Sequence, residues 1–382
     1  MLIAFAAMAK QHVRKEWEIM RVLHLLTSGG IGGIETLMRN YAGYSQHENV
    51  FLFVYSGGVI ADEIAAMNKE VLYVPAELRG NAARLKWIMN RLKTLRLDVI
   101  VSHHSSPIFK LVLACSRVLL PGVKLVAYAH ANAADIIAAH EKGASIRKLV
   151  HYIGFKSAHG IIAISGSVQK SLEHVLGINK KNVYVLYNAV SIPEVLPPVN
   201  AFSEKPEVVY VGRLIREKGV QTILSALAHD GLYKNMHLTV VGDGPYREQL
   251  EALAAELGVS QAVDFVGLQH DITPFLLKAD IFVHAPEWEE GFGITVVEAM
   301  AYGLLCICTN NGALPELISD EENGFLVEAH SASALAQKLA WVKANAASQQ
   351  SFETIRKNAQ KAAGGFNAQK YARELDAYLM TR

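Results

Sequence analysis

Hydrophobic positions along the first half of the chain fall into short, nearly continuous runs that alternate with segments of helical periodicity. Apolar runs of about four to eight residues indicate buried strands, and the amphipathic segments between them indicate helices. This alternation predicts a doubly wound, parallel sheet whose ligands bind beyond the carboxyl ends of the strands. The expected strands are 21–27, 50–55, 71–74, 98–103, 124–130, 160–165 and 183–187, and the expected helices include 81–95, 108–119, 146–157 and 167–175.

The stretch 192–205 interrupts this pattern, because it is rich in proline and has little periodicity, and it predicts an interdomain linker. The alternation then resumes, and the length of 382 residues supports a second domain. We therefore expect two Rossmann-like α/β domains facing across a cleft, 1–195 and 196–366, followed by a C-terminal helix within 367–382. The later strands are expected at 207–212, 236–242, 262–267 and 279–285, and the later helices at 272–278, 293–303, 331–346, 350–362 and 368–380.

Three features of the chain bear on its location. No apolar run reaches the ~18–20 residues that a membrane span needs. The apolar start, residues 1–8, is followed rather than preceded by basic residues such as Lys10, which is the wrong order for a secretory signal. The cysteines Cys115, Cys306 and Cys308 are an odd, sparse set typical of a reducing compartment. We expect a cytoplasmic protein.

Charge is distributed unevenly between the halves. Residues 1–195 carry 22 Lys+Arg and 13 Asp+Glu, a formal charge of +9, whereas the remainder carries −8. The helix 81–95 and the stretch 142–156 combine basic and apolar positions, which predicts peripheral binding to an anionic membrane surface at its cytoplasmic face. Alternatively, the apolar face packs on the sheet and the charges are solvated. Nothing predicts a nucleic-acid partner. The basic positions concerned are Arg84, Lys86, Arg91, Lys93, Arg96, Lys142, Arg147, Lys148 and Lys156.

The stretch 287–303 carries the strongest chemical signal. An apolar strand, 279–285, runs into a loop with acidic residues and two glycines, and a helix is expected to begin near 293 and to end at Gly303. The free N–H groups of a helix start bind phosphate, and glycines permit close approach. Glu290 and Glu298 would then accept hydrogen bonds from vicinal hydroxyls. The alternative is a solvated acidic loop followed by an ordinary helix with one surface glutamate.

This stretch resembles the E-x7-E motif of the retaining, nucleotide-sugar-dependent glycosyltransferases of the GT-B type, the family-four group that includes glycogen-synthase-like and bacterial polysaccharide and lipopolysaccharide enzymes. Glu290 and Glu298 match its two acids. The resemblance implies that the first acid contacts the donor sugar and the second the nucleotide ribose. It also implies a C-terminal helix that crosses back to the first domain. The intervening positions implied to contact the donor are Gly291, Phe292, Gly293, Ile294 and Thr295.

The second half matches this family at two further places. The resemblance implies that Arg213 and Lys218, which follow Gly212, hold the donor phosphates, and that Val266 and Gly267 face the base. The chemistry supports the first assignment independently, since two cations stabilise a diphosphate leaving group without a metal. We expect both basic side chains to lie in a solvent-facing loop. The alternative, exposed cations with no ligand, is weakened by the helix dipole, which disfavours cations at a helix start.

The first half contributes weaker signals. A glycine-rich loop follows the strand 21–27, but a dinucleotide fingerprint would need glycine where Glu35 stands. The resemblance implies instead that Gly32 and Gly33 lie beneath the donor diphosphate and that His130 hydrogen-bonds the donor sugar. A tight turn and a strand-end histidine satisfied by the backbone are the structural alternatives. The neighbouring His103–His104 pair has no nearby carboxylate or cysteine to complete a metal site.

We expect a hexosyltransferase that moves a sugar from a UDP- or GDP-linked donor to a hydroxyl of a glycan or lipid-linked acceptor, with retention. The chain has no D-x-D triplet, so we expect neither a metal nor another cofactor. Two alternatives stay open: a nucleotide-sugar epimerase or hydrolase, and a non-catalytic nucleotide-sugar-binding subunit. The sequence does not determine the sugar, the base, the acceptor or the oligomeric state.

Overall fold

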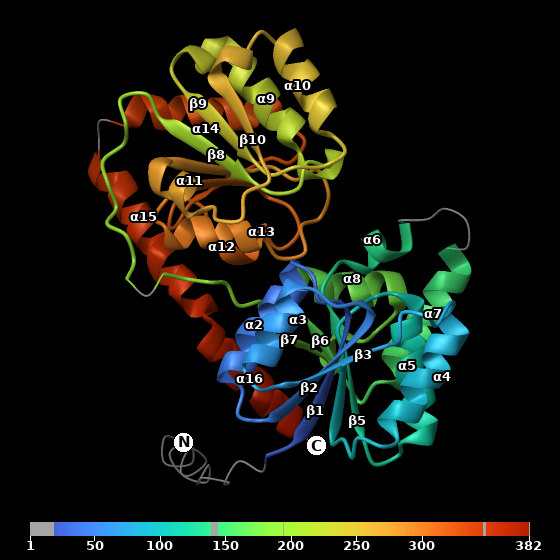
Figure 1. Ribbon diagram of the computed structural model, residues 1–382. Coiled ribbons are helices and arrows are strands. Elements are labelled where there is room, and N and C mark those ends of the chain that lie inside the picture. Colours follow the sequence, from blue (N-terminus) through green and yellow to red (C-terminus); the bar gives the residue numbers. More distant parts are fainter. Residues whose placement is uncertain (1–18, 139–143, 194, 347–348, 382) are drawn as a thin grey trace, which may run out of the picture. The chain divides into compact units, whose positions relative to one another are not determined.

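The computed structural model describes residues 19–138, 144–193, 195–346 and 349–381 (Figure 1). The apolar start of the chain and Lys142 lie outside these ranges. The strands form two sheets, and the chain folds into two compact units. The first unit holds residues 1–128, 149–160 and 375–382, and the second holds residues 129–148 and 161–374. No helix in the described ranges is both long and apolar enough to cross a membrane.

The first sheet has seven strands in the order β3-β2-β1-β4-β5-β6-β7. Its strand pairs are parallel, so their carboxyl ends share one edge. The inner strands are mostly buried and rich in valine, leucine and isoleucine, as parallel strands covered on both faces require, whereas the edge strands β3 and β7 are partly exposed. Their bounds are β1 Arg21–Ser28, β2 Glu48–Ser56, β3 Glu70–Tyr73, β4 Val99–Ser102, β5 Lys124–Ala129, β6 Gly160–Ala163 and β7 Val183–Val185.

Helices cover both faces of this sheet, with α2 and α3 on one face and α4, α5 and α7 on the other (Figure 1). In α4 the apolar residues Ile88, Met89 and Leu92 are buried, so the apolar face of this basic helix packs inward, as the structural alternative expected. The bounds are α2 Gly33–Tyr44, α3 Val59–Ala66, α4 Asn81–Leu92, α5 Pro107–Leu119, α6 Ala133–Ala138, α7 Ala144–Ser157 and α8 Gly166–Leu176.

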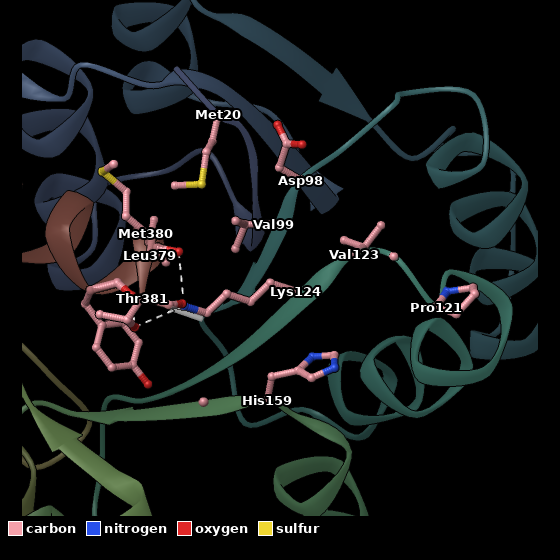
Figure 2. A pocket seen from close by; sticks show the side chains of 13 residues that line it. Met20, Asp98, Val99, Pro121, Val123, Lys124, His159, Leu379, Met380 and Thr381 are labelled. Carbon is pink, nitrogen blue, oxygen red and sulfur yellow. Dashed lines mark hydrogen bonds between the residues drawn. The ribbon is translucent and has the colours of Figure 1, made fainter. Parts of the chain in front are cut away.

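The end of the C-terminal helix, α16 (Ala368–Met380), packs on the first unit. Buried Asp376 accepts a hydrogen bond of 2.6 Å from the Tyr41 hydroxyl and one of 2.9 Å from the Ser45 hydroxyl. Lys124, at the amino end of β5, donates to the carbonyls of Tyr378 and Leu379, each at 3.0 Å, beside a cavity of about 380 Å³ (Figure 2). A cation on the last carbonyls of a helix opposes the negative end of its dipole.

The second sheet has six strands in the order β10-β9-β8-β11-β12-β13, again with parallel pairs. Its core includes buried residues of β8, β11 and β12 together with those of α9 and α14. Cys306 and Cys308 are buried. The strand bounds are β8 Glu207–Val211, β9 His237–Val241, β10 Val263–Gly267, β11 Ile281–His284, β12 Leu305–Thr309 and β13 Phe325–Val327.

The helices of this sheet connect its parallel strands and extend to the chain's end. Their bounds are α9 Val220–Ala228, α10 Arg247–Glu256, α11 Thr273–Lys278, α12 Ile294–Ala301, α13 Leu314–Leu317, α14 Ala332–Asn345 and α15 Gln349–Ala363. The predicted architecture, two doubly wound parallel sheets, is confirmed. Short α3 was not among the predicted helices. Several strands end earlier than predicted, so His103 and His130 lie just beyond β4 and β5 rather than inside them.

Candidate active site

The loop between β11 and α12 is held firmly at the carboxyl edge of the second sheet. The backbone N–H of Ala313 donates to the Glu290 carbonyl at 2.8 Å, and the Asn311 amide donates to the Trp288 carbonyl at 2.7 Å. Gly312 adopts a left-handed φ of 59°, and a Cβ there would overlap the backbone of Glu290. The backbone around Glu290 is therefore fixed before any ligand binds.

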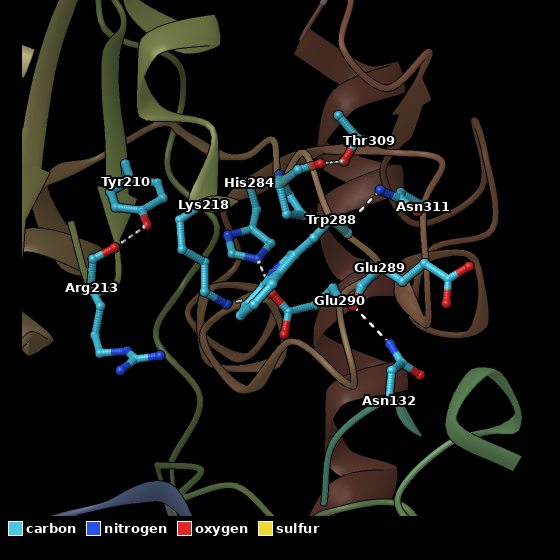
Figure 3. A network of polar contacts seen from close by, with 11 residues as sticks. Asn132, Tyr210, Arg213, Lys218, His284, Trp288, Glu289, Glu290, Thr309 and Asn311 are labelled. Carbon is cyan, nitrogen blue, oxygen red and sulfur yellow. Dashed lines mark hydrogen bonds and ion pairs between the residues drawn. The ribbon is translucent and has the colours of Figure 1, made fainter. Parts of the chain in front are cut away.

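Three charged or polar side chains meet within this loop, and we name Lys218, Glu290 and His284 the carboxylate cluster (Figure 3). The Lys218 ammonium lies 2.6 Å from Glu290 Oε2, and His284 Nε2 lies 3.0 Å from the same oxygen. Burial alone would raise the pKa of Glu290, but the His284 hydrogen bond and the Lys218 charge outweigh it and hold the pKa well below its usual range. Burial lowers the pKa of His284. Glu290 is therefore an anion at any physiological pH.

The position of Lys218 corrects one expectation. Its side chain is only 16% exposed, so it does not lie in a solvent-facing loop, whereas Arg213 is exposed. The next residue, Gly219, has a φ of 71°, and a Cβ there would overlap the carbonyl oxygen of Ala285. This close approach of the β8–α9 connection to the end of β11 brings Lys218 onto Glu290. Arg213 has no ion-pair partner in the described ranges.

Glu298 has the opposite surroundings. It lies on α12, is half-buried, and has no side-chain partner among the described residues. Burial raises its pKa to about 7. It is therefore not the ordinary surface glutamate of the structural alternative, but a carboxyl group whose charge is poorly stabilised in the free protein.

The residues between the two acids form the start of α12. Gly293 precedes the helix with a φ of 100° and has no side chain to cap it. The first N–H groups of the helix, including those of Ile294 and Thr295, therefore have no capping side chain. The Ser165 hydroxyl donates to the Gly291 carbonyl at 2.7 Å. The Phe292 ring is buried against aromatic neighbours, so only its backbone is left to meet a ligand.

His130 and Asn132 follow β5 and lie close to this loop. A Cβ at Gly291 would be 3.8 Å from the His130 carbonyl oxygen, an ordinary contact distance. The Asn132 amide donates to the Glu289 carbonyl at 2.8 Å (Figure 3). The structure thus brings His130 beside the residues predicted to hold the donor.

Other predicted residues lie elsewhere along the carboxyl edges. Gly267 ends β10 with a φ of 74°, and the Val266 carbonyl accepts from Gln269 at 2.8 Å. The Gly212 carbonyl lies against Gly242, where a Cβ would overlap it. Gly32 is the N-cap of α2, which begins at Gly33, and no side chain caps the start of this helix.

The histidines near the glycine-rich loop are explained by local hydrogen bonds. His103 Nε2 lies 3.0 Å from His24 Nδ1, and the Thr27 hydroxyl contacts His104. The buried Glu35 folds back beside Gly32 and lies 3.5 Å from His104. Across the described residues, no group of three or more His, Cys, Asp or Glu side chains is arranged to hold a metal ion.

Comparison with known proteins gives two family-model matches. Residues 31–193 match the glycosyltransferase family 4 model, and residues 192–362 match the glycosyl transferases group 1 model. The protein is a family-four GT-B glycosyltransferase. Its E-x7-E segment, 290–298, lies within the group 1 match.

Relatives of this glycosyltransferase include LpsE of Rhizobium meliloti, a lipopolysaccharide core biosynthesis glycosyltransferase. The two are 32% identical over 143 residues, covering 37% of this chain and 41% of LpsE. The N-acetyl-alpha-D-glucosaminyl L-malate synthase of Bacillus anthracis is 23% identical over 240 residues, 61% of each chain. The matches thus span about half the length of these relatives. The crystal structure of HepE from Anabaena with UDP and glucose has a TM-score of 0.78 at 20% identity, covering 95% of this chain and all of HepE, and shows the same fold.

Three polar residues of this site are not among the predicted site residues. His284 is the last residue of β11, Trp288 lies beside Lys218, and Asn132 follows His130 by two positions. Three of their polar atoms are buried and have no hydrogen-bond partner among the described residues: His284 Nδ1, Trp288 Nε1 and Asn132 Oδ1. A polar residue at the carboxyl end of an apolar strand was the available signal for His284.

Proposed function

We propose that this glycosyltransferase moves a hexose from a UDP- or GDP-linked sugar to a hydroxyl of a glycan or lipid-linked acceptor, with retention, in the synthesis of a cell-surface polysaccharide or lipopolysaccharide. The carboxylate cluster carries the proposal, because it sets an obligate anion and a cation directly before the uncapped start of α12. LpsE is named for lipopolysaccharide core synthesis, and the HepE structure contains UDP and glucose, which supports this substrate class.

In the proposed reaction the bond between the anomeric carbon and the diphosphate oxygen breaks as the acceptor oxygen bonds to that carbon on the same face. The acceptor's proton passes to the leaving diphosphate. Arg213, Lys218 and the first N–H groups of α12 stabilise the negative charge that grows on the diphosphate. Glu290 and His130 orient the sugar, and Glu298 accepts hydrogen bonds from the ribose. We further propose that no divalent metal takes part.

Peripheral binding to an anionic membrane is a second element of the proposal. The apolar face of α4 is buried, but α7 exposes Ile146, Leu149 and Ile153, the first of them at 72%. Basic Arg147 and Lys148 lie on the same helix. An exposed apolar stripe beside cations suits a surface of anionic headgroups over acyl chains.

Vesicle sedimentation tests the membrane element. We expect the protein to sediment with phosphatidylglycerol vesicles at low salt and to be released as salt rises. Replacing Ile146, Leu149 and Ile153 by serine should abolish sedimentation. Charge reversal at Arg84 and Arg91 of α4, whose apolar face is buried, should only weaken it. An unaltered protein that ignores these vesicles would contradict this element.

Donor turnover tests the main proposal. The protein is incubated with UDP- and GDP-sugars, with and without glycoside and lipid-linked acceptors, and the anomeric configuration of the product is determined by NMR. We expect an acceptor-dependent product with the donor's configuration. Equal donor consumption without any acceptor would support the epimerase or hydrolase alternative, and donor binding without any turnover would support the non-catalytic alternative.

A further inference from the structure

A carboxylate from α13 binds the start of α8. Glu316 Oε2 accepts the backbone N–H of Gly166 at 2.8 Å, and Glu316 Oε1 accepts that of Ser167 at 2.7 Å. The next N–H group, that of Val168, donates to the Ser165 hydroxyl at 3.1 Å. A carboxylate is favoured here by the positive end of the helix dipole as well. The first three N–H groups of α8 are thus occupied by side chains, and one of these comes from a segment 150 positions away.

Two neighbours fit this place to the carboxylate. The Tyr187 hydroxyl donates to Glu316 Oε2 at 3.0 Å. Burial, and then the charge of Glu316 and this hydrogen bond, raise the pKa of Tyr187 to about 12, so the hydroxyl stays a donor. At Gly166 an added Cβ would lie 3.1 Å from Glu316 Oε2, which is closer than an ordinary contact. The carboxylate therefore needs glycine at this position to bind without hindrance.

The chain segment that carries Glu316 also holds the backbone of Glu290. The N–H of Ala313 donates to the Glu290 carbonyl at 2.8 Å. The N–H of Glu316 in turn donates to the Ala313 carbonyl at 2.9 Å. The attachment to α8 and the support of Glu290 therefore lie on one short turn, 313–316, that is closed by its own hydrogen bond.

A second contact ties the loop of Glu290 to the same helix start. The Ser165 hydroxyl, which caps α8, donates to the Gly291 carbonyl at 2.7 Å. Glu290 therefore lies between two points attached to α8, one through Ser165 and one through Glu316. All of these residues belong to the second compact unit. Neither contact involves the ion pair of the carboxylate cluster, so the backbone position of Glu290 is set separately from its charge.

We propose that Glu316 is a positioning residue for Glu290. By binding the start of α8 it fixes the turn 313–316, and this turn sets where the Glu290 carboxylate meets the donor sugar. This inference rests on the proposed transferase function and adds to it a residue that acts only through Glu290. A misplacement of about 1 Å at a reacting group lowers a rate about 100-fold, so loosening this turn should lower kcat.

The test is a double-mutant cycle on kcat, with the best donor and acceptor from the turnover screen. Glu316→Ala should lower kcat about 10- to 100-fold and change the UDP dissociation constant less than about threefold. In the Glu290→Gln background the same change should lower kcat less than about threefold, because the group that Glu316 positions is already altered. A merely structural role would lower kcat equally in both backgrounds.

A second variant keeps Glu316 and does not weaken the helix. Gly166→Ala introduces a better helix former, so α8 should not be destabilised, but its methyl group would displace the Glu316 carboxylate. We expect kcat to fall about 3- to 10-fold at an unchanged midpoint of thermal unfolding. The matched control is Glu328→Gln, which neutralises an exposed glutamate after β13 and should leave kcat and UDP affinity unchanged.

A kcat of Glu316→Ala within about twofold of the unaltered protein would overturn the inference, and so would equal losses in the two backgrounds. Both results would leave the proposed function standing. If Glu316→Ala does not fold, the cycle of Gly166→Ala with Glu290→Gln decides by the same criterion. An unaltered protein without any turnover would remove the proposed function, and the positioning role with it.

Discussion

The segment 290–298 has a glutamate at each end, and these two glutamates lie in opposite surroundings. Glu290 is ion-paired with Lys218 and hydrogen-bonded by His284, and its pKa is held well below the usual range. Glu298 is also largely removed from water, yet it has no partner among the described residues, and its pKa rises to about 7. Burial is common to both residues, so the difference comes from partners.

This difference separates two tasks. A carboxylate that is already paired and fixed costs little reorganisation when a charged transition state forms, which suits the reacting sugar. A carboxyl group that lacks partners gains them when ribose hydroxyls arrive, which suits binding. We therefore propose that the Glu290 end of the segment serves the chemistry and the Glu298 end serves nucleotide affinity, and variants at each end should separate kcat from donor affinity.

The largest effect is expected at Glu290. Glu290→Gln should lower kcat by about three orders of magnitude, in the range known for loss of a fixed transition-state contact, and should change UDP affinity little. Steady-state kinetics with calorimetry of UDP binding checks this. A variant that loses UDP affinity but keeps its kcat would reverse the assignment.

The cations come next. Lys218→Ala and Arg213→Ala should each lower turnover by about two to three orders of magnitude, because each removes a charge from the leaving diphosphate. Their stabilities should differ. Only Lys218→Ala removes the ion-pair partner of a buried carboxylate, which then keeps only its contact with His284, and it should lower the free energy of unfolding by about 2 kcal/mol. Denaturant unfolding measures this, and near-normal turnover in both variants would remove the phosphate-binding role.

Glu298 should make donor affinity depend on pH. Its pKa is raised in the free protein, and ribose hydroxyls favour the carboxylate, so UDP affinity should rise as pH rises from about 6 to 8. The charge also destabilises the fold, fully above pH 7 and not below the ordinary pKa of 4.5. Glu298→Gln should therefore be the more stable protein at pH 8, by about 1–3 kcal/mol, and should bind UDP about tenfold less tightly there.

Calorimetry across this pH range, with Glu298→Gln as reference for the titration of UDP itself, isolates the contribution of Glu298. Identical pH profiles for the two proteins would show that Glu298 does not meet the nucleotide.

The smallest effect is expected on chelation. Excess EDTA should leave turnover within about twofold, because cations and helix N–H groups replace a divalent ion in the proposal. Loss of activity in EDTA that Mg²⁺ or Mn²⁺ restores would show that a metal takes part.

Much of this arrangement is local and could be predicted from the sequence. The apolar run before Glu290, the glycines at 291 and 293 and the helix that follows are neighbours in sequence, so periodicity and turn chemistry predict β11, the loop and α12. The two parallel sheets follow from the same alternation. Helix α3 was missed because only Asp62 and Glu63 are polar among its eight residues, so no amphipathic period stands out.

The partners of each carboxylate could not be predicted, because they come from distant positions. Lys218 reaches Glu290 only because Gly219 lets the β8–α9 connection pass close to Ala285. That contact also made the solvent-facing prediction for Lys218 wrong. The hydrophobic pattern predicts the elements on which these residues lie, whereas the tertiary fold determines which of the residues form pairs.

Hydrogen–deuterium exchange with and without UDP tests most directly whether the segment 287–303 is the nucleotide site. The account predicts that UDP slows exchange in peptides covering 212–219 and 287–303. Exchange in peptides at the amino ends of the strands of the first sheet, such as 121–124, should be unchanged. The Glu298→Gln variant should show weaker slowing at the same UDP concentration. Slowing confined to the glycine-rich loop 28–35, with none in 287–303, would contradict the account.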